Sequence, residues 1–318
     1  MRYGLGLQTT LARTASVAGI GVHSGSLAAV TIRPAQADTG IVFVAPGEWG
    51  GPVALPAEAR QVASTRLATV LRAGDVCVAT VEHLLAALRG LGIDNARIEV
   101  DGNEVPILDG SAAPFVHAID EAGVTVLTAP RRELRVLRPV RVEAGDAYAE
   151  LLPHECARYD VTIDFPDPAI GRQRFASDLS PGVFRRELAA ARTFGDVAEI
   201  PRLRAAGLAL GSSLANSIGL ENGRVLNPEG LRWADEFVRH KTLDAVGDLS
   251  LAGPPLIGLF RSFKGGHGLN FAAVRALLAD PANFALEPAE GAEPDRFARR
   301  EPATGRLVAG ALFAPDHG

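Results

Sequence analysis

The sequence predicts an α+β fold built from two related halves, and three observations carry this prediction. In each half, short apolar segments typical of strands precede a segment with the apolar spacing of a helix. The helical segments HLLAALRGLG, from residue 83, and HKTLDAVGDL, from residue 240, share a pattern of helix, glycine and strand when they are aligned on their histidines. Between the halves, TAPRRELRV contains Pro130 and a pair of arginines, a composition typical of a linker.

These observations define the expected domains. A chain of 318 residues is long enough for two domains of ordinary size, each with its own core. The segment after residue 282 is rich in Pro, Glu and Ala, which favours partial disorder. We therefore expect an N-terminal domain at residues 1–128, a linker at 129–134, a C-terminal domain at 135–282 and a partly disordered tail at 283–318.

The first half reads as strands followed by helices. Val81, Leu84, Leu85 and Leu88 have helical spacing, and two glycines then end that helix. The expected strands are SLAAVTIRPA (26–35), GIVFVAP (40–46), the weaker STRLATVLRAG (64–74) and ARIEVDG (96–102); the expected helices lie at 80–92 and 113–122. The turn-rich segment LDGSAAPF, which leads into the second helix, predicts a turn and a helix N-cap at Asp109-Gly110-Ser111.

The second half repeats this order. Its expected strands are LRVLRPVRVEAG (134–145), YAELLP (148–153), YDVTIDF (159–165) and PLIGLFRSF (255–263); its expected helices lie at about 183–193, 233–248 and 269–280. In the helix at 233–248, Val238, Ala245, Val246 and Leu249 form one apolar stripe.

The composition excludes several classes of protein. Hydrophobic residues make up 47% and charged residues 22% of the chain, as in a soluble globular protein. The net charge of −5 argues against a nucleic-acid binder. No apolar run reaches the ~20 residues that span a bilayer, and the N-terminus lacks the apolar core of a secretion signal. Two cysteines make neither a disulfide framework nor a CxxC metal site, so we expect a cytoplasmic protein.

The most informative segment is WADEFVRHKTLDAVGD. His240, Asp244 and Asp248 follow one another at intervals of four residues, so they share one helix face. An imidazole and a carboxylate placed in this way can bind one divalent cation. Beside them lies Lys241, one of only two lysines in the chain; the other is Lys264. An ordinary solvent-facing pair of His240 and Asp244 is the alternative.

A third metal ligand has to come from elsewhere in the chain. His83 is the best candidate, because it begins the matching helix and follows Glu82, which can act as a base. Residue 87 is Ala, so this is not an HExxH motif, and the remaining ligands have to come from the other half. A histidine of the core or surface is the alternative for His83.

The other histidines differ in their surroundings. His267 lies in FKGGHGLN, and Asp248 is a plausible partner that keeps its imidazole protonated for acid catalysis. The same glycines also suit an ordinary hairpin or helix cap. His23 is ambiguous, while three histidines without supporting neighbours are expected to be structural or exposed: His117, His154 and His317.

Long motifs also connect this chain to a known family. TVEHLLAALRGLGIDN, PILDGSAAPF, ARTFG, GRVLNPEGLRWADEFVRHKTLDAVGD and KGGHGLN lie within residues 8–280. In these blocks the chain resembles the zinc-dependent UDP-3-O-acyl-N-acetylglucosamine deacetylases of lipid A synthesis. The resemblance implies two domains, each a layered β-α-α-β sandwich, with the active site between the domains.

The resemblance also implies roles for individual residues. It implies Zn²⁺ as the cofactor, with His83, His240 and Asp244 as ligands. Catalytic roles follow for Glu82 as general base, His267 as the protonated histidine, Asp248 as its partner, and Thr193 as a hydroxyl that binds the tetrahedral intermediate. Residues implied in substrate binding are Lys241, Lys264, Phe194, Phe165, Asp164 and Leu214.

Some positions depart from the pattern of the family. Ala147 stands where a lysine is common, Ser212 replaces a glycine, and Leu214 stands where a larger aromatic residue is expected. These changes leave the zinc chemistry intact, but they affect the expected contacts with the diphosphate and the preferred length of the acyl chain. The small, apolar segment AGLALGSSLANSIGL is the expected acyl passage, with an ordinary core crossing as the alternative.

The expected reaction is hydrolysis of the acetamide of UDP-3-O-(3-hydroxyacyl)-N-acetylglucosamine, the committed step of lipid A synthesis. The expected partner is this acylated UDP-sugar. We expect a monomer that binds no nucleic acid, and the amphiphilic substrate allows transient contact with a membrane surface. The rival functions are a zinc peptidase, a two-metal phosphoesterase and a closed structural zinc site. A site with three protein ligands and Glu82 beside them argues against the structural zinc site.

Overall fold

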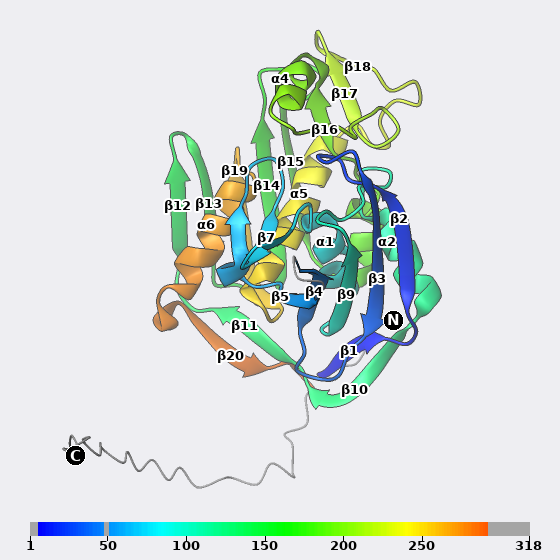
Figure 1. Ribbon diagram of the computed structural model, residues 1–318. Coiled ribbons are helices and arrows are strands. Elements are labelled where there is room, and N and C mark those ends of the chain that lie inside the picture. The colour runs from blue at the N-terminus through cyan, green and yellow to red at the C-terminus, as the bar shows by residue number, and fades with distance from the viewer. Residues whose placement is uncertain (1–5, 48–50, 292–318) are drawn as a thin grey trace, which may run out of the picture.

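The computed structural model describes residues 6–47 and 51–291. It confirms a mixed α+β fold, with helices between two principal sheets (Figure 1). The first sheet has the strand order β2-β3-β9-β4-β5, in which only the β4–β9 pair is parallel. Its strands are β2 (Ala15–Ile20), β3 (Leu27–Pro34), β4 (Ile41–Pro46), β5 (Pro52–Pro56) and β9 (Ala96–Asp101).

The second sheet is built from the second half of the chain. It has the order β12-β13-β19-β11-β20, and β14 joins it by pairing in parallel with β19 and antiparallel with β15. Its strands are β11 (Arg132–Val136), β12 (Val140–Ala144), β13 (Ala147–Leu152), β14 (Ala157–Asp164), β15 (Arg172–Asp178), β19 (Leu256–Phe263) and β20 (Phe284–Pro288).

Four helices of ten residues or more lie among the described residues. They are α1 (Glu82–Leu91), α2 (Ala113–Ala122), α5 (Glu236–Leu249) and α6 (His267–Leu278). Helix α1 packs against α5, while α6 packs against β12 and β13. Almost every residue of α1 and α5 is buried, because both helices are covered on all sides by other elements. Gly92, at φ 77°, ends α1 in the left-handed conformation that glycine adopts without strain.

Smaller elements complete the chain. β1 (Leu7–Leu11) pairs with β10 (Val124–Pro130). Three short strands, β6 (Val62–Ser64), β7 (Val70–Ala73) and β8 (Val76–Val78), form a separate sheet before α1. A second small sheet contains β16 (Phe194–Asp196), β17 (Ile218–Glu221) and β18 (Arg224–Val225), and α4 (Ile200–Ala205) lies between its first two strands in the chain.

Three local predictions differ from the structure. The strand expected at 134–145 is divided into β11 and β12. The strand expected at 64–74 is divided into β6 and β7 by a loop in which Leu67 has a φ of 65°. The helix expected at 183–193 is limited to α3 (Pro181–Val183) and the π-helical turn η2 (Phe184–Leu188). The chain leaves the helix there because the Arg192 N–H donates to Glu236 and the Thr193 N–H donates to the Gly110 carbonyl. Tertiary contacts override local helical spacing at this point.

The structure adds detail near the expected domain boundaries without testing the division into domains. The expected linker at 129–134 contains the end of β10 and the start of β11. The segment assigned to a tail begins with β20, which pairs with β11, and residues 292–318 lie outside the described part of the chain. Among the described residues, no helix combines the length and apolar character needed to cross a membrane.

Candidate metal centre and active site

The close approach of α1 and α5 brings the two halves of the chain together. At the contact lies Gly247, where an added Cβ would stand 2.1 Å from the Glu82 carbonyl oxygen. No side chain other than hydrogen fits at that distance. Gly247 therefore allows the N-terminal turn of α1, with Glu82 and His83, to lie against the face of α5 that carries His240 and Asp244.

Three buried side chains converge at this contact. The His240 Nε2 atom lies 3.3 Å and the His83 Nε2 atom 3.5 Å from Asp244 Oδ1. Within the described residues, His83, His240 and Asp244 are the one group of three or more possible ligands whose donor atoms lie within 4.8 Å of one another. Ligand atoms about 2.0–2.2 Å from a tetrahedral ion lie roughly 3.3–3.5 Å apart. The observed spacing therefore fits a small divalent cation.

The hydrogen bonding of these residues supports the same interpretation. The Asp244 Oδ1 atom, which both Nε2 atoms approach, is buried and has no hydrogen-bond partner among the described residues. A buried carboxylate oxygen without a donor is costly, and a cation would satisfy it. The carboxylates of Glu82, Asp244 and Asp248 also outnumber the cationic side chains of Lys241 and His267 in this region, so a divalent cation would offset excess negative charge.

Two of the three possible ligands, His240 and Asp244, are held in a state that suits metal binding. His240 Nδ1 lies 3.0 Å from the Ala191 carbonyl oxygen, which orients Nε2 towards Asp244. Burial lowers the pKa of His240 to about 3, so its imidazole is neutral and can bind a metal. Burial raises the pKa of the Asp244 carboxyl, but neighbouring cationic groups, including Lys241 at 2.9 Å, bring the net pKa well below its usual range.

Glu82 lies beside this group at the start of α1. Its Oε2 atom accepts a hydrogen bond of 3.0 Å from the Thr69 backbone N–H. Its Oε1 atom accepts none from the described residues and lies 3.8 Å from His267 Nε2. Burial raises the pKa of the Glu82 carboxyl, which makes it a stronger base than an exposed glutamate.

His267 begins α6 and faces Glu82 across the site. Its Nδ1 atom lies 2.8 Å from Asp248 Oδ2, and Asn270 donates to the same oxygen at 2.9 Å. Burial alone would lower the pKa of His267, but Asp248 and the other carboxylates raise it to about 10. The imidazole therefore carries a proton at neutral pH, and its Nε2–H faces the cavity.

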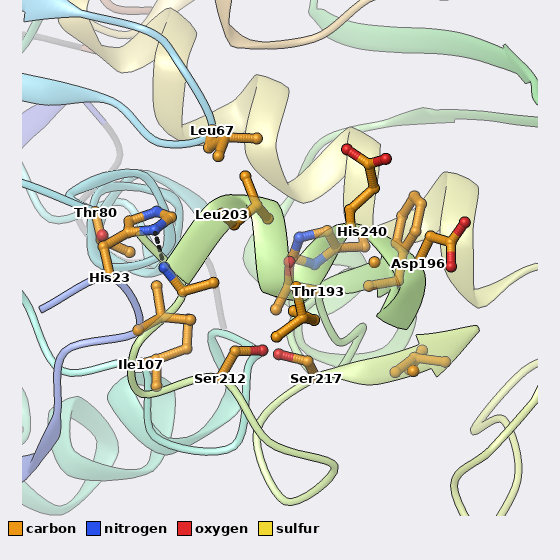
Figure 2. Close-up of a pocket in the computed structure, with 18 of the residues that line it drawn as sticks. His23, Leu67, Thr80, Ile107, Thr193, Asp196, Leu203, Ser212, Ser217 and His240 are labelled. Carbon is orange, nitrogen blue, oxygen red and sulfur yellow. Dashed lines mark hydrogen bonds between the residues drawn. The ribbon is translucent and has the colours of Figure 1, made fainter. Parts of the chain in front are cut away.

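A cavity of about 890 Å³ leads to these groups (Figure 2). Figure 2 shows Thr193 and His240 on one side of this cavity and His23 with Thr80 on the other. The cavity continues from His83, His240 and Asp244 to the side chains of Leu203 on α4 and Leu214 in the loop before β17. The part lined by Leu203 and Leu214 is its apolar end, and charged side chains of the same segment, including Arg202 and Arg204, line the cavity as well.

The structure separates the expected substrate-binding residues into two sets. Phe194, Lys241 and Leu214 line the cavity. Asp164, Phe165 and Lys264 do not belong to its lining. The Lys264 ammonium lies 2.6 Å from Asp146 and 3.7 Å from Asp164, and the Phe165 ring stands edge-on to Phe194 with 5.7 Å between centroids. The second set therefore forms a surface cluster that adjoins the cavity through Phe194.

The remaining histidines lie apart from the metal ligands or at the edge of the cavity. His117 is exposed and pairs with Glu121, and His154 contacts the backbone of Cys156. His23 lines the cavity, and its Nδ1 accepts a weak hydrogen bond of 3.4 Å from the Ala209 N–H. His317 lies outside the described residues.

Besides Gly247, three residues that support the site were not expected from the sequence. Thr69 and Asn270 are buried and donate hydrogen bonds to Asp248. Gly110, expected only in a turn, has a φ of 84°, and an added Cβ would lie 2.2 Å from the Asn216 carbonyl oxygen. Its carbonyl accepts the Thr193 N–H, so this turn positions Thr193. Two of them lie in motifs that the sequence shows, Gly110 in LDGSAAPF and Asn270 in KGGHGLN, while nothing in the local sequence indicates the role of Thr69.

Comparison with known proteins identifies the family. The family described as "LpxC: UDP-3-O-acyl N-acetylglycosamine deacetylase" matches residues 8–279. The chain belongs to this family. It is 50% identical over 281 residues to the UDP-3-O-acyl-N-acetylglucosamine deacetylases of Brucella ovis, Brucella canis and Brucella melitensis, covering 88% of this chain and 98% of each relative. The prediction of a deacetylase from the sequence motifs is confirmed at the level of the family.

Proposed function

We propose that this LpxC-family enzyme hydrolyses the acetamide of UDP-3-O-(3-hydroxyacyl)-N-acetylglucosamine, releasing acetate and UDP-3-O-acyl-glucosamine. This is the committed step of lipid A biosynthesis. The names of its relatives support the assignment of this substrate. The observation that carries the chemistry is a group of three possible metal ligands beside Glu82 and His267, at the end of a cavity large enough for an acylated sugar.

The cation that we propose is Zn²⁺, held by His83, His240 and Asp244. Two imidazoles and a carboxylate are a ligand set typical of catalytic zinc, which keeps one position open. Zinc would supply polarisation of the acetamide carbonyl and would lower the pKa of water from about 15.7 to about 7. A peptidase or phosphoesterase would use similar ligands, but the membership of this family favours the deacetylase.

Glu82 and His267 provide the proton transfers. The free Oε1 atom of Glu82 faces the site, so this carboxylate accepts the proton of the attacking water. The Nε2–H of His267 lies on the other side, where it stabilises the developing oxyanion and then protonates the departing amine. Asp248 keeps the imidazole protonated and fixes its orientation through the 2.8 Å contact at Nδ1.

Thr193 is the third group that we assign to stabilisation of the oxyanion. Its side chain lines the cavity near His240, and its hydroxyl has no hydrogen-bond partner among the described residues. The Gly110 and Ile218 backbones fix its position, because the Thr193 N–H donates to one and its carbonyl accepts from the other. Loss of one such donor raises the barrier by about 3–4 kcal/mol.

The two sets of substrate-binding residues suit different parts of the substrate. We assign the apolar end of the cavity, with Leu203 and Leu214, to the acyl chain. We assign the adjoining cluster of Asp164, Phe165 and Lys264 to the nucleotide, because an exposed aromatic ring and a lysine suit a base and a diphosphate. Phe194 and Lys241 lie in the cavity, so we place the sugar there.

We also propose a cytoplasmic monomer that contacts the membrane surface transiently. Two free cysteines support a reducing compartment. Exposed leucines near the apolar end of the cavity, including Leu210 and Leu214, support contact with the membrane that holds the acyl chain of the substrate.

The test is to measure acetate and the free amine released from UDP-3-O-acyl-N-acetylglucosamine of several acyl lengths by the zinc-loaded protein. We expect equal amounts of the two products from the wild type. Glu82→Gln should keep zinc but lose turnover by about 10²–10⁴-fold, the usual contribution of a general base. Glu121→Gln, at an exposed pair far from α5, is the matched control. A folded, zinc-loaded wild type that releases no acetate would refute the proposal.

A further inference from the structure

The loop between β6 and β7 covers the acid and base of the site. It runs from Thr65 to Thr69, and both Thr65 and Leu67 line the cavity. Leu67 takes a φ of 65°, a left-handed conformation that costs a residue with a branched side chain about 1 kcal/mol or more. Such a conformation persists only where surrounding contacts hold it. Besides a hydrogen bond of 3.2 Å from the Arg66 N–H to the Ser64 hydroxyl, the contacts that connect this loop to the site are those of Thr69.

Thr69 uses all three of its polar groups in hydrogen bonds to the site. Its N–H donates to Glu82 Oε2 at 3.0 Å, and its carbonyl accepts the Val81 N–H at 3.4 Å. Its hydroxyl donates to Asp248 Oδ1 at 2.6 Å. The side chain is 1% exposed, so no bulk water replaces these bonds. One residue is therefore bonded to the proposed base and to the carboxylate behind the proposed acid.

The hydroxyl of Thr69 completes the surroundings of Asp248. Oδ2 of Asp248 already accepts from Asn270 and contacts His267, while Thr69 is the only donor to Oδ1 among the described side chains. Without that donor, a buried carboxylate oxygen would be unsatisfied, and the carboxylate, held through Oδ2 alone, would be less firmly oriented and could rotate. The rotation would move Oδ2, and with it the imidazole of His267.

We propose that Thr69 is a positioning residue, whose hydroxyl fixes Asp248, and thereby His267, at the distance from Glu82 that the reaction requires. It links residues 179 positions apart in the sequence and so ties the N-terminal half to the acid carried by the C-terminal half. This inference rests on the proposed function. Thr69 touches neither the reacting atoms nor the three metal ligands, so its effect is on kcat rather than on binding of substrate or zinc.

The test compares Thr69→Val with Thr69→Ser in the zinc-loaded full chain. Valine keeps the shape but removes the hydroxyl, and serine restores it. We expect Thr69→Val to lower kcat by about 10–100-fold, as do losses of other groups that orient catalytic side chains. KM and zinc content should stay within twofold of the wild type, and Thr69→Ser should recover most of kcat.

Two further variants separate positioning from stability. Thr10→Val is the matched control, because the hydroxyl of Thr10 is also buried and donates at 2.8 Å to Asn95, far from the site. It should lower the melting temperature but leave kcat unchanged. In an Asp248→Ala background, Thr69→Val should cause no further loss of kcat, because the group on which it acts is absent.

The outcomes are distinct. A Thr69→Val enzyme with normal kcat, or with lost zinc, would overturn the proposal, as would an undiminished effect in the Asp248→Ala background. If Thr69→Val does not fold, Thr69→Cys replaces it in the test, because its thiol is similar in size to the hydroxyl and a weak donor. The proposal then requires a partial loss of kcat in Thr69→Cys. A wild type that releases no acetate would refute the proposed function instead.

Discussion

Gly247→Ala tests whether the contact of α1 with α5 builds the metal centre. The added Cβ would lie 2.1 Å from the Glu82 carbonyl oxygen, and carbon and oxygen come no closer than about 3.2 Å in ordinary contact. The helices therefore have to separate by about 1 Å at this point. Alanine in place of glycine favours a helix by about 1 kcal/mol, which is less than the about 1–3 kcal/mol that an overpacked core loses.

The same separation acts on the ligands. His83 is on α1 and Asp244 on α5, and their ligand atoms are 3.5 Å apart. One ion with bonds of about 2.0–2.1 Å can join atoms no more than about 4.2 Å apart. An extra 1 Å would put these two atoms about 4.5 Å apart, which is too far for one ion to bind both unless the side chains move. We expect Gly247→Ala to weaken zinc binding by at least about 10–100-fold and to lower kcat in parallel.

Competition with a chelator of known zinc affinity measures this loss directly, with thermal unfolding recorded on the same samples. Gly51→Ala is the control, because an added Cβ there meets nothing within 4 Å. It should leave zinc affinity and activity unchanged. Wild-type zinc affinity in the Gly247→Ala protein would refute the reasoning, since the two helices would then not need their close contact to hold the metal.

The remaining predictions concern pH and stability. Burial raises the pKa of Glu82, so kcat/KM should fall as pH decreases through that raised value and Glu82 becomes protonated. The pKa of His267 is raised to about 10. We therefore expect kcat/KM to fall a second time at high pH, where His267 loses its proton. Asp248→Asn should move this decrease in kcat/KM to lower pH. An unchanged position of the decrease would contradict the pairing of Asp248 with His267. Arg192→Met would leave the buried Glu236 carboxylate without its 2.9 Å partner; we expect about 3–5 kcal/mol less stability in urea unfolding, and a loss below 1 kcal/mol would contradict this.

Local spacing in the sequence was sufficient to predict much of the site. The interval of four residues placed His240, Asp244 and Asp248 on one face of a helix, and the structure has all three on α5. His83 was chosen because it follows Glu82 at the start of a matching helix. The structure brings its Nε2 atom to 3.5 Å from Asp244, although their roles as zinc ligands remain a proposal.

Contacts between distant segments could not be predicted in the same way. Thr69 lies in a segment that has the composition of a strand, and nothing in its local sequence indicates hydrogen bonds to Glu82 and Asp248. Gly247 looked like an ordinary glycine near a helix end, but its importance depends on how closely another helix approaches. The irregular loop before β7 forms because these tertiary bonds outweigh β-propensity, which depends strongly on context.

The central claim is that His83, His240 and Asp244 hold one zinc ion that is required for deacetylation. The most direct measurement is a zinc titration of the chelated protein while acetate release from UDP-3-O-acyl-N-acetylglucosamine is followed. The account predicts no activity without metal and a rise that ends at one zinc per chain, with His240→Ala inactive at the same concentrations. Full activity in the metal-free protein, or an unchanged titration for His240→Ala, would contradict it.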